Sequence, residues 1–373
     1  MTYIVKRLPF ILAAVTFLSF ALPCRIRLRW KFLWLVVLEL CAARLAVLTS
    51  VTGSMTLPDW PAWTLWLWDW AYCGGLLLLP LSLVWWGRRA RHIVLPAIAW
   101  GVAALGVWSA AKTPAVRETV LEFEDLPAGL DGYRIVQLAD FHASFESRRS
   151  RTAKIVEVAN SLSPDLICLT GDNVDGSPST HEKEIAPICG LRARDGVWAV
   201  SGNHEYYRRR ALWRPAYGRL GIRFLENECV FPRKGLALGG VNDDAAAKYR
   251  FVSKDSPYYD NGPAADVAKT FAAATNGEFR VLMQHQPKHA PENISEHGVR
   301  LQISGHTHGG IVPLVAQLVK LGNGGFIRGA YDVGGGKLYV SSGLGQWAGL
   351  PMRIFNPTEI SLIVLRRKGK AGT

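Results

Sequence analysis

Five short polar clusters, each directly after an apolar run typical of a buried strand, limit what this chain can fold into. They are Asp140-Phe141-His142, Gly171-Asp172-Asn173-Val174-Asp175, Gly202-Asn203-His204-Glu205, His285, and Gly305-His306-Thr307-His308-Gly309-Gly310. Five of the nine histidines fall in this set, mixed with carboxylates and an amide. Imidazole, carboxylate and amide ligands together suit two neighbouring divalent transition metals. The pattern therefore predicts a two-metal site built at strand ends.

Apolar runs alternate with helical stretches around these clusters. The predicted strands are Tyr133–Leu138, Asp165–Thr170, Val197–Val200, Leu236–Val241, Phe279–Met283, Val299–Ile303, Lys337–Ser341 and Ile360–Leu365. A helical pattern near Arg151–Leu162 is closed by Ser163-Pro164, because proline cannot continue a helix. This alternation predicts an α/β sandwich in which loops at strand ends place the ligands.

The first 111 residues are crowded with Leu, Ala, Val and Trp. Four apolar stretches can be drawn, at Leu8–Cys24, Phe32–Thr49, Trp63–Trp86 and Ile93–Ala111. Each is long enough to span a bilayer, the first barely, and a cleaved signal peptide is the alternative for that one. We expect a bundle of about four transmembrane helices in residues 1–111, a linker at 112–132 and the soluble domain at 133–373.

Positive charge is divided between the two parts of the chain. Of the net +13, residues 1–111 carry +7 and the rest +6, so no single patch predicts a nucleic-acid partner. Seven cations flank one side of the spans (Arg25, Arg27, Arg29, Lys31, Arg88, Arg89, Arg91) and four the other (Lys6, Arg7, Lys112, Arg117). The larger group favours the cytoplasm. We expect a multi-pass protein of the cell (inner) membrane with its soluble domain on the outer, periplasmic side.

The five clusters, in this order, resemble the calcineurin-like metallophosphoesterase superfamily over about Tyr133–Leu365. The resemblance implies a β-sandwich flanked by helices and a binuclear site for Mn, Zn or Fe. One metal would be held by Asp140, His142, Asp172 and His308, and the other by Asp172, Asn203, His285 and His306. Asp172 would then bridge the two ions. The run His306-Thr307-His308, called HxH below, needs a turn that aims each imidazole at its own metal. The surrounding glycines permit such a turn.

The implied chemistry is hydrolysis of a phosphoester. Two metals can share a hydroxide, orient phosphate oxygens and stabilise an in-line displacement. We assign His204 as the general acid that protonates the leaving oxygen, and Asp175 as the group that orients a histidine. The implied substrate is a phosphodiester or a pyrophosphate.

Two features indicate which branch of the superfamily the chain resembles. Gly176 follows Asp175 where serine/threonine protein phosphatases would carry an arginine, which argues against that activity. The tail, with Gly343-Leu344-Gly345, Pro351-Met352-Arg353 and Glu359-Ile360, resembles a bacterial membrane-associated branch that includes phosphodiesterases. Lipid-linked substrates such as UDP-diacylglucosamine are associated with related enzymes. Ile311–Lys320 is mostly apolar and could lie against acyl chains, with a packed core segment as the alternative.

Other interpretations stay open from the sequence. The substrate could be a soluble nucleotide, with the membrane only an anchor. A membrane assembly or transport factor with a vestigial hydrolase domain is a non-catalytic alternative, although few intramembrane charges argue against transport. Arg208, Arg209, Arg210 and Arg214 could hold a phosphate group, and plain surface charge explains them equally well.

Overall fold

The computed structural model describes residues 10–22, 26–51, 62–84, 91–144, 147–207, 210–248, 262–275, 277–347 and 350–369. The chain forms two compact units. A helical unit contains Met1–Lys112 and Gln346–Ile354, and a sheet unit contains Thr113–Gly345 and Phe355–Thr373. The excursion Gln346–Ile354 was not predicted to join the helices; the Arg353 amide donates to the Gly106 carbonyl at 2.9 Å.

The helical unit covers the apolar stretches of the sequence. Its helices are Phe10–Ala21, which ends in the π-helical turn η1 (Phe17–Ala21), α2 (Leu28–Val51), α3 (Ala62–Val84) and α4 (Arg91–Ala111). The ends of the predicted first span lie outside the described residues. Within the described chain, only Ile93–Ala111 is long and apolar enough to cross a membrane.

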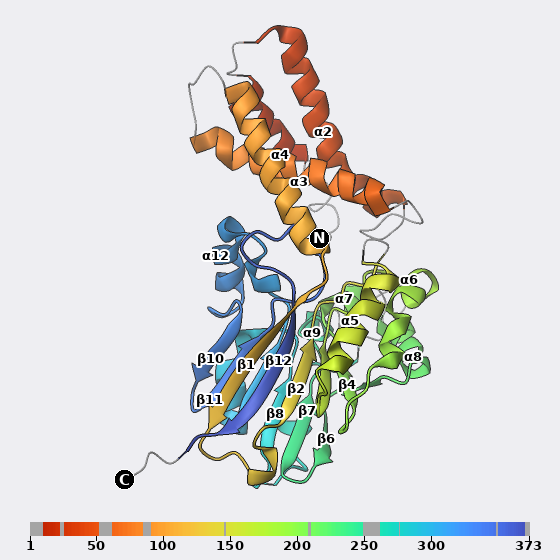
Figure 1. Ribbon diagram of the computed structural model, residues 1–373, viewed down its shortest axis with the longest axis vertical. Coiled ribbons are helices and arrows are strands. Elements are labelled where there is room, and N and C mark those ends of the chain that lie inside the picture. Colours follow the sequence, from red (N-terminus) through yellow and green to blue (C-terminus); the bar gives the residue numbers. More distant parts are fainter. Residues whose placement is uncertain are drawn as a thin grey trace. The chain divides into compact units, whose positions relative to one another are not determined.

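Two mixed six-stranded sheets build the sheet unit (Figure 1). The first has the order β1 (Ala115–Phe123), β12 (Glu359–Arg367), β2 (Arg134–Leu138), β3 (Leu166–Thr170), β4 (Val197–Val200), β5 (Arg223–Phe224). The second has the order β10 (Gly329–Val333), β11 (Gly336–Val340), β9 (Leu301–Ser304), β8 (Phe279–Met283), β7 (Leu236–Gly240), β6 (Glu228–Arg233). Within them, β2–β3–β4 and β7–β8–β9 are parallel.

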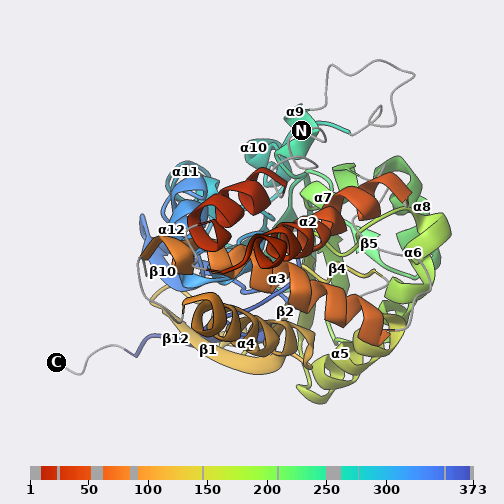
Figure 2. The same ribbon diagram turned by 90° about the horizontal axis from the view of Figure 1, so that it is seen from above.

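Alternation along the central strands decides what each side chain packs against. Ile135 lies in the core between the sheets, whereas its neighbour Val136 faces the helices on the outer side. Helices α5 (Arg149–Ser161), α6 (Pro178–Ile185) and α8 (Arg210–Arg219) lie on one side of the sandwich, and α10 (Val267–Thr270) and α11 (Ala290–His297) on the other (Figure 2). The predicted α/β sandwich is confirmed.

Short helices and turns complete the sheet unit. They are η2 (Ala128–Leu130), η3 (Ala186–Gly190), α7 (Asn203–Tyr207), α9 (Ala245–Lys248), η4 (Pro287–His289), η5 (His308–Gly310) and α12 (Pro313–Gly322). Of these, α7 and η5 begin at residues of the polar clusters. Two of the five clusters therefore contain the point where helical backbone begins.

The segment expected to be a linker, 112–132, instead contains a strand. β1 pairs in parallel with β12 along its whole length, from Ala115 opposite Glu359 to Phe123 opposite Arg367. Its first half is exposed and carries charge, and only Leu121 and Phe123 reach the core. Charge on a half-exposed edge strand hides the apolar pattern. The sequence analysis also missed β5, β6 and β10. Like β1, these three strands lie at sheet edges, where one side of the strand is not covered by a neighbour.

Candidate metal centre

The loops after β2 and β3 place the first two clusters side by side. Beyond the ends of these strands the backbones stay paired: Asp140 N donates to Gly171 O at 3.0 Å and His142 N to Asp172 O at 3.0 Å. Ala143 N continues the ladder to Asn173 O at 2.9 Å. Because β2 and β3 are parallel neighbours, their carboxyl ends meet at one edge of the sheet. Sheet pairing thus brings together residues that are about thirty positions apart.

Five of the clustered residues adopt left-handed backbone. The φ values are 54° for Asp140, 44° for His142, 52° for Asp172, 70° for His306 and 49° for His308. Non-glycine residues rarely take this conformation, which costs of order 1 kcal/mol or more each and concentrates at functional sites. In extended backbone, side chains two residues apart would point alike; the left-handed turns break that alternation and aim each group individually.

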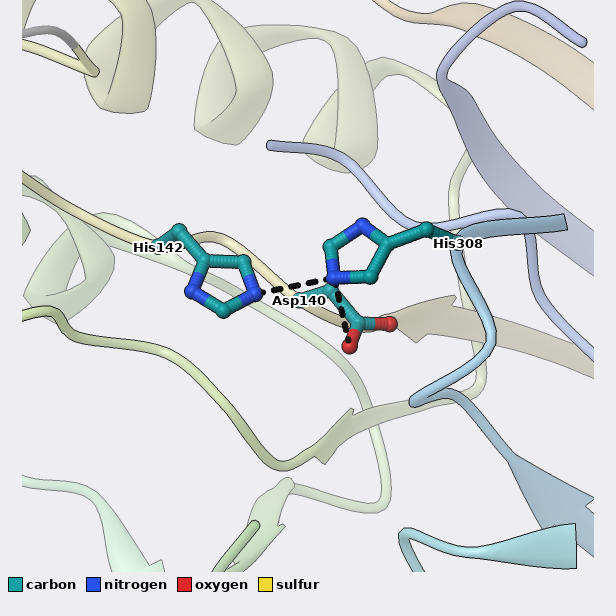
Figure 3. Close-up of side chains that lie close together, drawn as sticks. All are labelled: Asp140, His142 and His308. Carbon is teal, nitrogen blue, oxygen red and sulfur yellow. Dashed lines mark hydrogen bonds and ion pairs between the residues drawn. The ribbon is translucent and has the colours of Figure 1, made fainter. Parts of the chain in front are cut away.

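One group of ligands consists of Asp140, His142 and His308 (Figure 3). The Nε2 atoms of the two imidazoles are 3.0 Å apart, and His308 Nε2 is 3.7 Å from Asp140 Oδ1. Their three candidate ligand atoms all lie within 4.8 Å of one another, and all three residues are buried. Two imidazole nitrogens and a carboxylate oxygen converging in a buried site form a donor set for a divalent metal.

A second group consists of Asp172, His285 and His306. His285 Nε2 lies 3.2 Å from Asp172 Oδ2 and 3.3 Å from His306 Nδ1. The same Asp172 Oδ2 is 3.9 Å from His142 Nε2, which belongs to the first group. The Asp172 carboxylate therefore stands between the two groups, where a bridging ligand would be.

Asn203 supplies an amide to the site. Its Oδ1 atom is buried and has no hydrogen-bond partner among the described residues. A buried polar atom left unpaired costs about 1–3 kcal/mol, so a native structure needs a reason to keep one. Metal coordination by Oδ1 would satisfy it. The residues present therefore fit a dimetal centre: six of the seven predicted ligands lie in the two groups, and Asn203 precedes His204, whose amide donates to Asp172 Oδ1.

Hydrogen bonds on the far side of two imidazoles select their tautomers. His285 Nδ1 lies 2.8 Å from the Thr170 carbonyl oxygen, which can only accept, so Nδ1 carries the proton and Nε2 is left as a ligand. His142 Nδ1 is 3.0 Å from Asp175 Oδ1, with the same consequence. Such outer partners orient metal-binding histidines and raise their basicity.

His204 lies close to the metal ligands: it forms a third group of candidate ligand atoms with His142 and Asp172, and the scheme that the sequence predicts assigns it the role of an acid instead. Its Nδ1 is hydrogen-bonded to Asp175 Oδ1, and its Nε2 lies 3.9 Å from Asp172 Oδ2. Burial opposes the charged form of His204, but the carboxylates of Asp172 and Asp175 outweigh burial and raise the pKa to about 9. Asp175 is buried as well, yet His142 and His204 hold the pKa of its carboxyl well below the ordinary value. The protein groups favour a protonated imidazole here.

Glu205 holds two of the loops together, a role that sequence reasoning missed. Its carboxylate accepts hydrogen bonds from the amides of Gly202 at 2.8 Å, Asn173 at 2.8 Å and Asp172 at 3.1 Å. It is buried, and burial followed by the Asp172 charge raises its pKa to about 7. In the sequence it resembles an ordinary acidic residue in the first turn of a helix, here α7.

Replacing Glu205 by glutamine is expected to weaken metal binding by about 10–100-fold, the usual effect of losing an outer-shell partner. The new side-chain NH₂ would face backbone N–H donors of the Asp172 loop and push that loop away. Metal affinity measured by competition with a chelator tests this. Glu182→Gln, which changes an exposed ion pair with Arg219, should leave affinity unchanged. Equal affinity of the wild-type and Glu205→Gln chains would remove the role assigned to Glu205.

Two further features shape the site. A Cβ on Gly202 would lie 2.2 Å from Asp172 Oδ1, and one on Gly305 would lie 2.5 Å from Asp140 Oδ2, so only glycine permits these close approaches. Asn356, which sequence analysis did not single out, donates from Nδ2 to the His308 carbonyl at 2.7 Å. This contact ties the HxH turn to the segment before β12.

The sequence left open whether the arginines after Asn203 bind phosphate, and the structure answers this for Arg210. Arg208 and Arg209 lie outside the described residues. Arg210 is buried and ion-paired with Glu226, and Arg214 lies 3.4 Å from the same carboxylate. A buried, paired guanidinium has its hydrogen-bonding capacity directed inward, so the Arg210 side chain serves the fold and does not present a phosphate contact.

Comparison with known proteins places the chain in a family. The calcineurin-like phosphoesterase model matches residues 133–310. A zebrafish (Danio rerio) protein described as a transmembrane protein with metallophosphoesterase domain is 32% identical over 287 residues, 74% of this chain and 63% of that protein, so the chain spans less than two thirds of that relative. An uncharacterized metallophosphoesterase of Helicobacter pylori is 30% identical over 267 residues, 71% of this chain and 68% of that protein.

Among solved structures, a dimetal phosphatase from Danio rerio shares 13% identity with a TM-score of 0.36, over 58% of this chain and 90% of that one. The sequence matches are the stronger finding. The matched family region runs from before Asp140 to beyond His308 and contains every residue of both ligand groups. The chain belongs to the calcineurin-like phosphoesterase family and is a metal-dependent phosphoesterase with a dimetal site of His and Asp residues.

Proposed function

We propose that this chain is a membrane-anchored phosphodiesterase or pyrophosphatase with two divalent ions (Mn, Zn or Fe). One ion is held by Asp140, His142, Asp172 and His308, and the other by Asp172, Asn203, His285 and His306. The observation that carries the proposal is the position of Asp172 Oδ2, 3.2 Å from His285 Nε2 and 3.9 Å from His142 Nε2. A shared carboxylate offsets part of the repulsion between two dications.

When bound, the ions would supply an activated water and positive charge that stabilises the phosphate in an in-line displacement. His204 and Asp175 would supply and position the proton for the leaving group. A hydroxide, formed when the activated water releases a proton to solvent, would bond to phosphorus as the bond from phosphorus to the leaving oxygen breaks, and His204 Nε2 would give its proton to that leaving oxygen. Asp175, bonded to His204 Nδ1, fixes the imidazole so that Nε2 carries the transferable proton. Asp175 also orients His142, which couples the acid to the metal site.

The helical unit supports membrane attachment. The apolar helix α4 ends at Ala111 and β1 begins at Ala115, so the sheet unit follows a candidate span almost at once. We propose that residues 1–111 form a multi-pass membrane region, that the soluble domain lies on the outer side, and that the substrate is a phosphoester carried by a lipid. The charge asymmetry of the loops supports the orientation.

Purified full-length chain in lipid nanodiscs tests the proposal. Metal content would be measured first, then hydrolysis of bis-p-nitrophenyl phosphate, of p-nitrophenyl phosphate and of two pyrophosphates that share a headgroup, UDP-diacylglucosamine in the disc and soluble UDP-N-acetylglucosamine. We expect about two ions per chain, diester cleavage above monoester cleavage, and faster turnover of the lipid-borne pyrophosphate. Preference for the soluble nucleotide would overturn the lipid assignment, and preference for the monoester would overturn the diesterase assignment.

A further inference from the structure

Helix α12 (Pro313–Gly322) begins shortly after the turn that carries His306 and His308, and the segment from Ile311 to its end has apolar side chains in two environments. Ile311 and Val312, which lead into it, are buried. Leu318 and Leu321 are 70% and 78% exposed, and they lie three residues apart, hence on one face of the helix. The start of the segment is therefore packed in the core, one of the two sequence alternatives, whereas its end leaves two leucines exposed.

Helix α12 packs against the loop that carries two of the candidate metal ligands. A Cβ on Gly310 would lie 2.7 Å from the Cβ of Ala316, so the HxH turn packs directly on α12. At the other end of the segment, Thr307 Oγ1 donates to the Ile327 carbonyl at 2.6 Å. Whatever surface seats α12 also sets the position of the metal ligands.

A third exposed apolar side chain, Phe355, precedes Asn356, the residue that binds the His308 carbonyl. It is 86% exposed and has a left-handed φ of 59°, which is unusual for an aromatic residue. Arg328 connects the two segments, because its Nη1 donates to Asn356 Oδ1 at 2.6 Å, and Asn356 in turn binds the His308 carbonyl. The segment of Phe355 and helix α12 are thus both attached to the turn that carries His308.

Cations accompany these apolar side chains. Lys320 is exposed on α12 itself, and Arg328 is exposed beside Phe355. Gly324, just after the helix, packs against the backbone of Lys288. An amphipathic helix that presents leucines with flanking Lys and Arg is typical of a segment that lies in the interface of an anionic bilayer.

The path of the chain supports a bilayer as the partner. Ala115, the first residue of β1, donates to the Thr358 carbonyl at 3.2 Å, three residues after Phe355. Only residues 112–114 separate Ala115 from the end of α4, and a stretch of this length reaches at most about 14 Å. With α4 in a membrane, this corner of the sheet unit is within reach of the bilayer surface.

We propose that Leu318, Leu321 and Phe355 form a bilayer-contact surface, which we call the docking rim, with Lys320 and Arg328 meeting anionic headgroups. The docking rim would seat the metal centre at the membrane, where it takes phosphoesters presented by the lipid layer; this last clause rests on the proposed function. A lipid surface fits because the contact is apolar, flanked by cations and joined to the metal turn.

Depth quenching on the full-length chain tests the docking rim. In nanodiscs with phosphatidylglycerol, an environment-sensitive fluorophore on Leu318→Cys would be compared with one on Leu212→Cys, in a Cys189→Ser background that removes an exposed thiol. Leu212 is 46% exposed on α8, on the other side of the sandwich. We expect lipid-borne quencher to reduce emission at Leu318 several-fold more than at Leu212. Equal quenching at the two positions would overturn the docking rim.

A second arm separates docking from the substrate assignment. For Leu318→Glu with Leu321→Glu, the ratio of lipid-borne to soluble diester turnover should fall at least tenfold, while metal content stays as in wild type; Leu212→Glu should leave the ratio unchanged. Strong quenching at Leu318 with an unchanged ratio would keep the docking rim and overturn the lipid-borne substrate. A fall in the ratio without quenching would overturn docking and keep the lipid substrate.

Discussion

Asp172→Ala is expected to abolish phosphodiester hydrolysis and to reduce bound metal from about two ions per chain to less than one. The reason is the position of the carboxylate between both ligand groups, 3.2 Å from His285 Nε2 and 3.9 Å from His142 Nε2. Its Oδ1 also accepts from the His204 amide at 2.7 Å, so the loop that carries the general acid loses its contact as well. Elemental analysis of the purified chain, beside the hydrolysis assay, measures both effects.

A matched aspartate provides the control. Asp332 has an 86% exposed side chain and pairs with Lys337, so Asp332→Ala removes an equal charge away from the ligand groups and should leave metal content and rate unchanged. If Asp172→Ala still held two ions, the shared-carboxylate arrangement would be wrong, because no other described carboxylate lies in both groups of the scheme. The two groups would then be independent sites.

His204→Ala is expected to lower kcat by ~10²–10⁴-fold, the usual contribution of a general acid, while both ions stay bound. The contrast with Asp172 follows from the assigned roles: His204 Nδ1 is hydrogen-bonded to Asp175 Oδ1, and each ion keeps four other ligands in the proposed scheme. The loss should depend on the leaving group. A p-nitrophenolate leaves without a proton, so the defect should be much smaller for bis-p-nitrophenyl phosphate than for an alkyl phosphodiester.

This dependence on the leaving group distinguishes an acid from a structural residue. Damage to the site would slow both substrates alike, and that result would contradict the role given to His204. His297→Ala is the control, because the His297 imidazole lies outside both ligand groups and its backbone carbonyl, which accepts from Arg280, is retained. Metal analysis of each variant shows whether the centre is intact. Loss of ions from His204→Ala would mean that His204 is a ligand.

Whether a strand could be predicted from the sequence depends on its position in the sheet. The central strands can be predicted because they form nearly unbroken apolar runs. An example is β3 (Leu166–Thr170), which is buried along its whole length. The edge strands cannot be predicted in this way, because one side of each meets solvent and tolerates charge, as in β1. Helix α4 matches the last predicted apolar stretch and, within the described residues, is long and apolar enough to cross a membrane.

The site shows the same division. Residues with metal-binding chemistry are visible as clusters because their side chains must be His, Asp or Asn. Glu205 and Asn356 were not visible, since a carboxylate that binds three amides of other loops and an amide that binds the His308 carbonyl gain their roles only from partners distant in sequence. No local pattern encodes such partners.

By itself the sequence determined the class of fold, the order of the polar clusters and the chemistry of their side chains, because these depend on periodicity and residue type. The tertiary structure decided which groups share an ion, through the parallel pairing of β2 with β3, which sets Asp140 beside Gly171 and His142 beside Asp172. It also decided that Leu318 and Leu321 face outward while Ile311 is buried. Both outcomes depend on what packs against a residue, and that contact exists only once distant segments have come together.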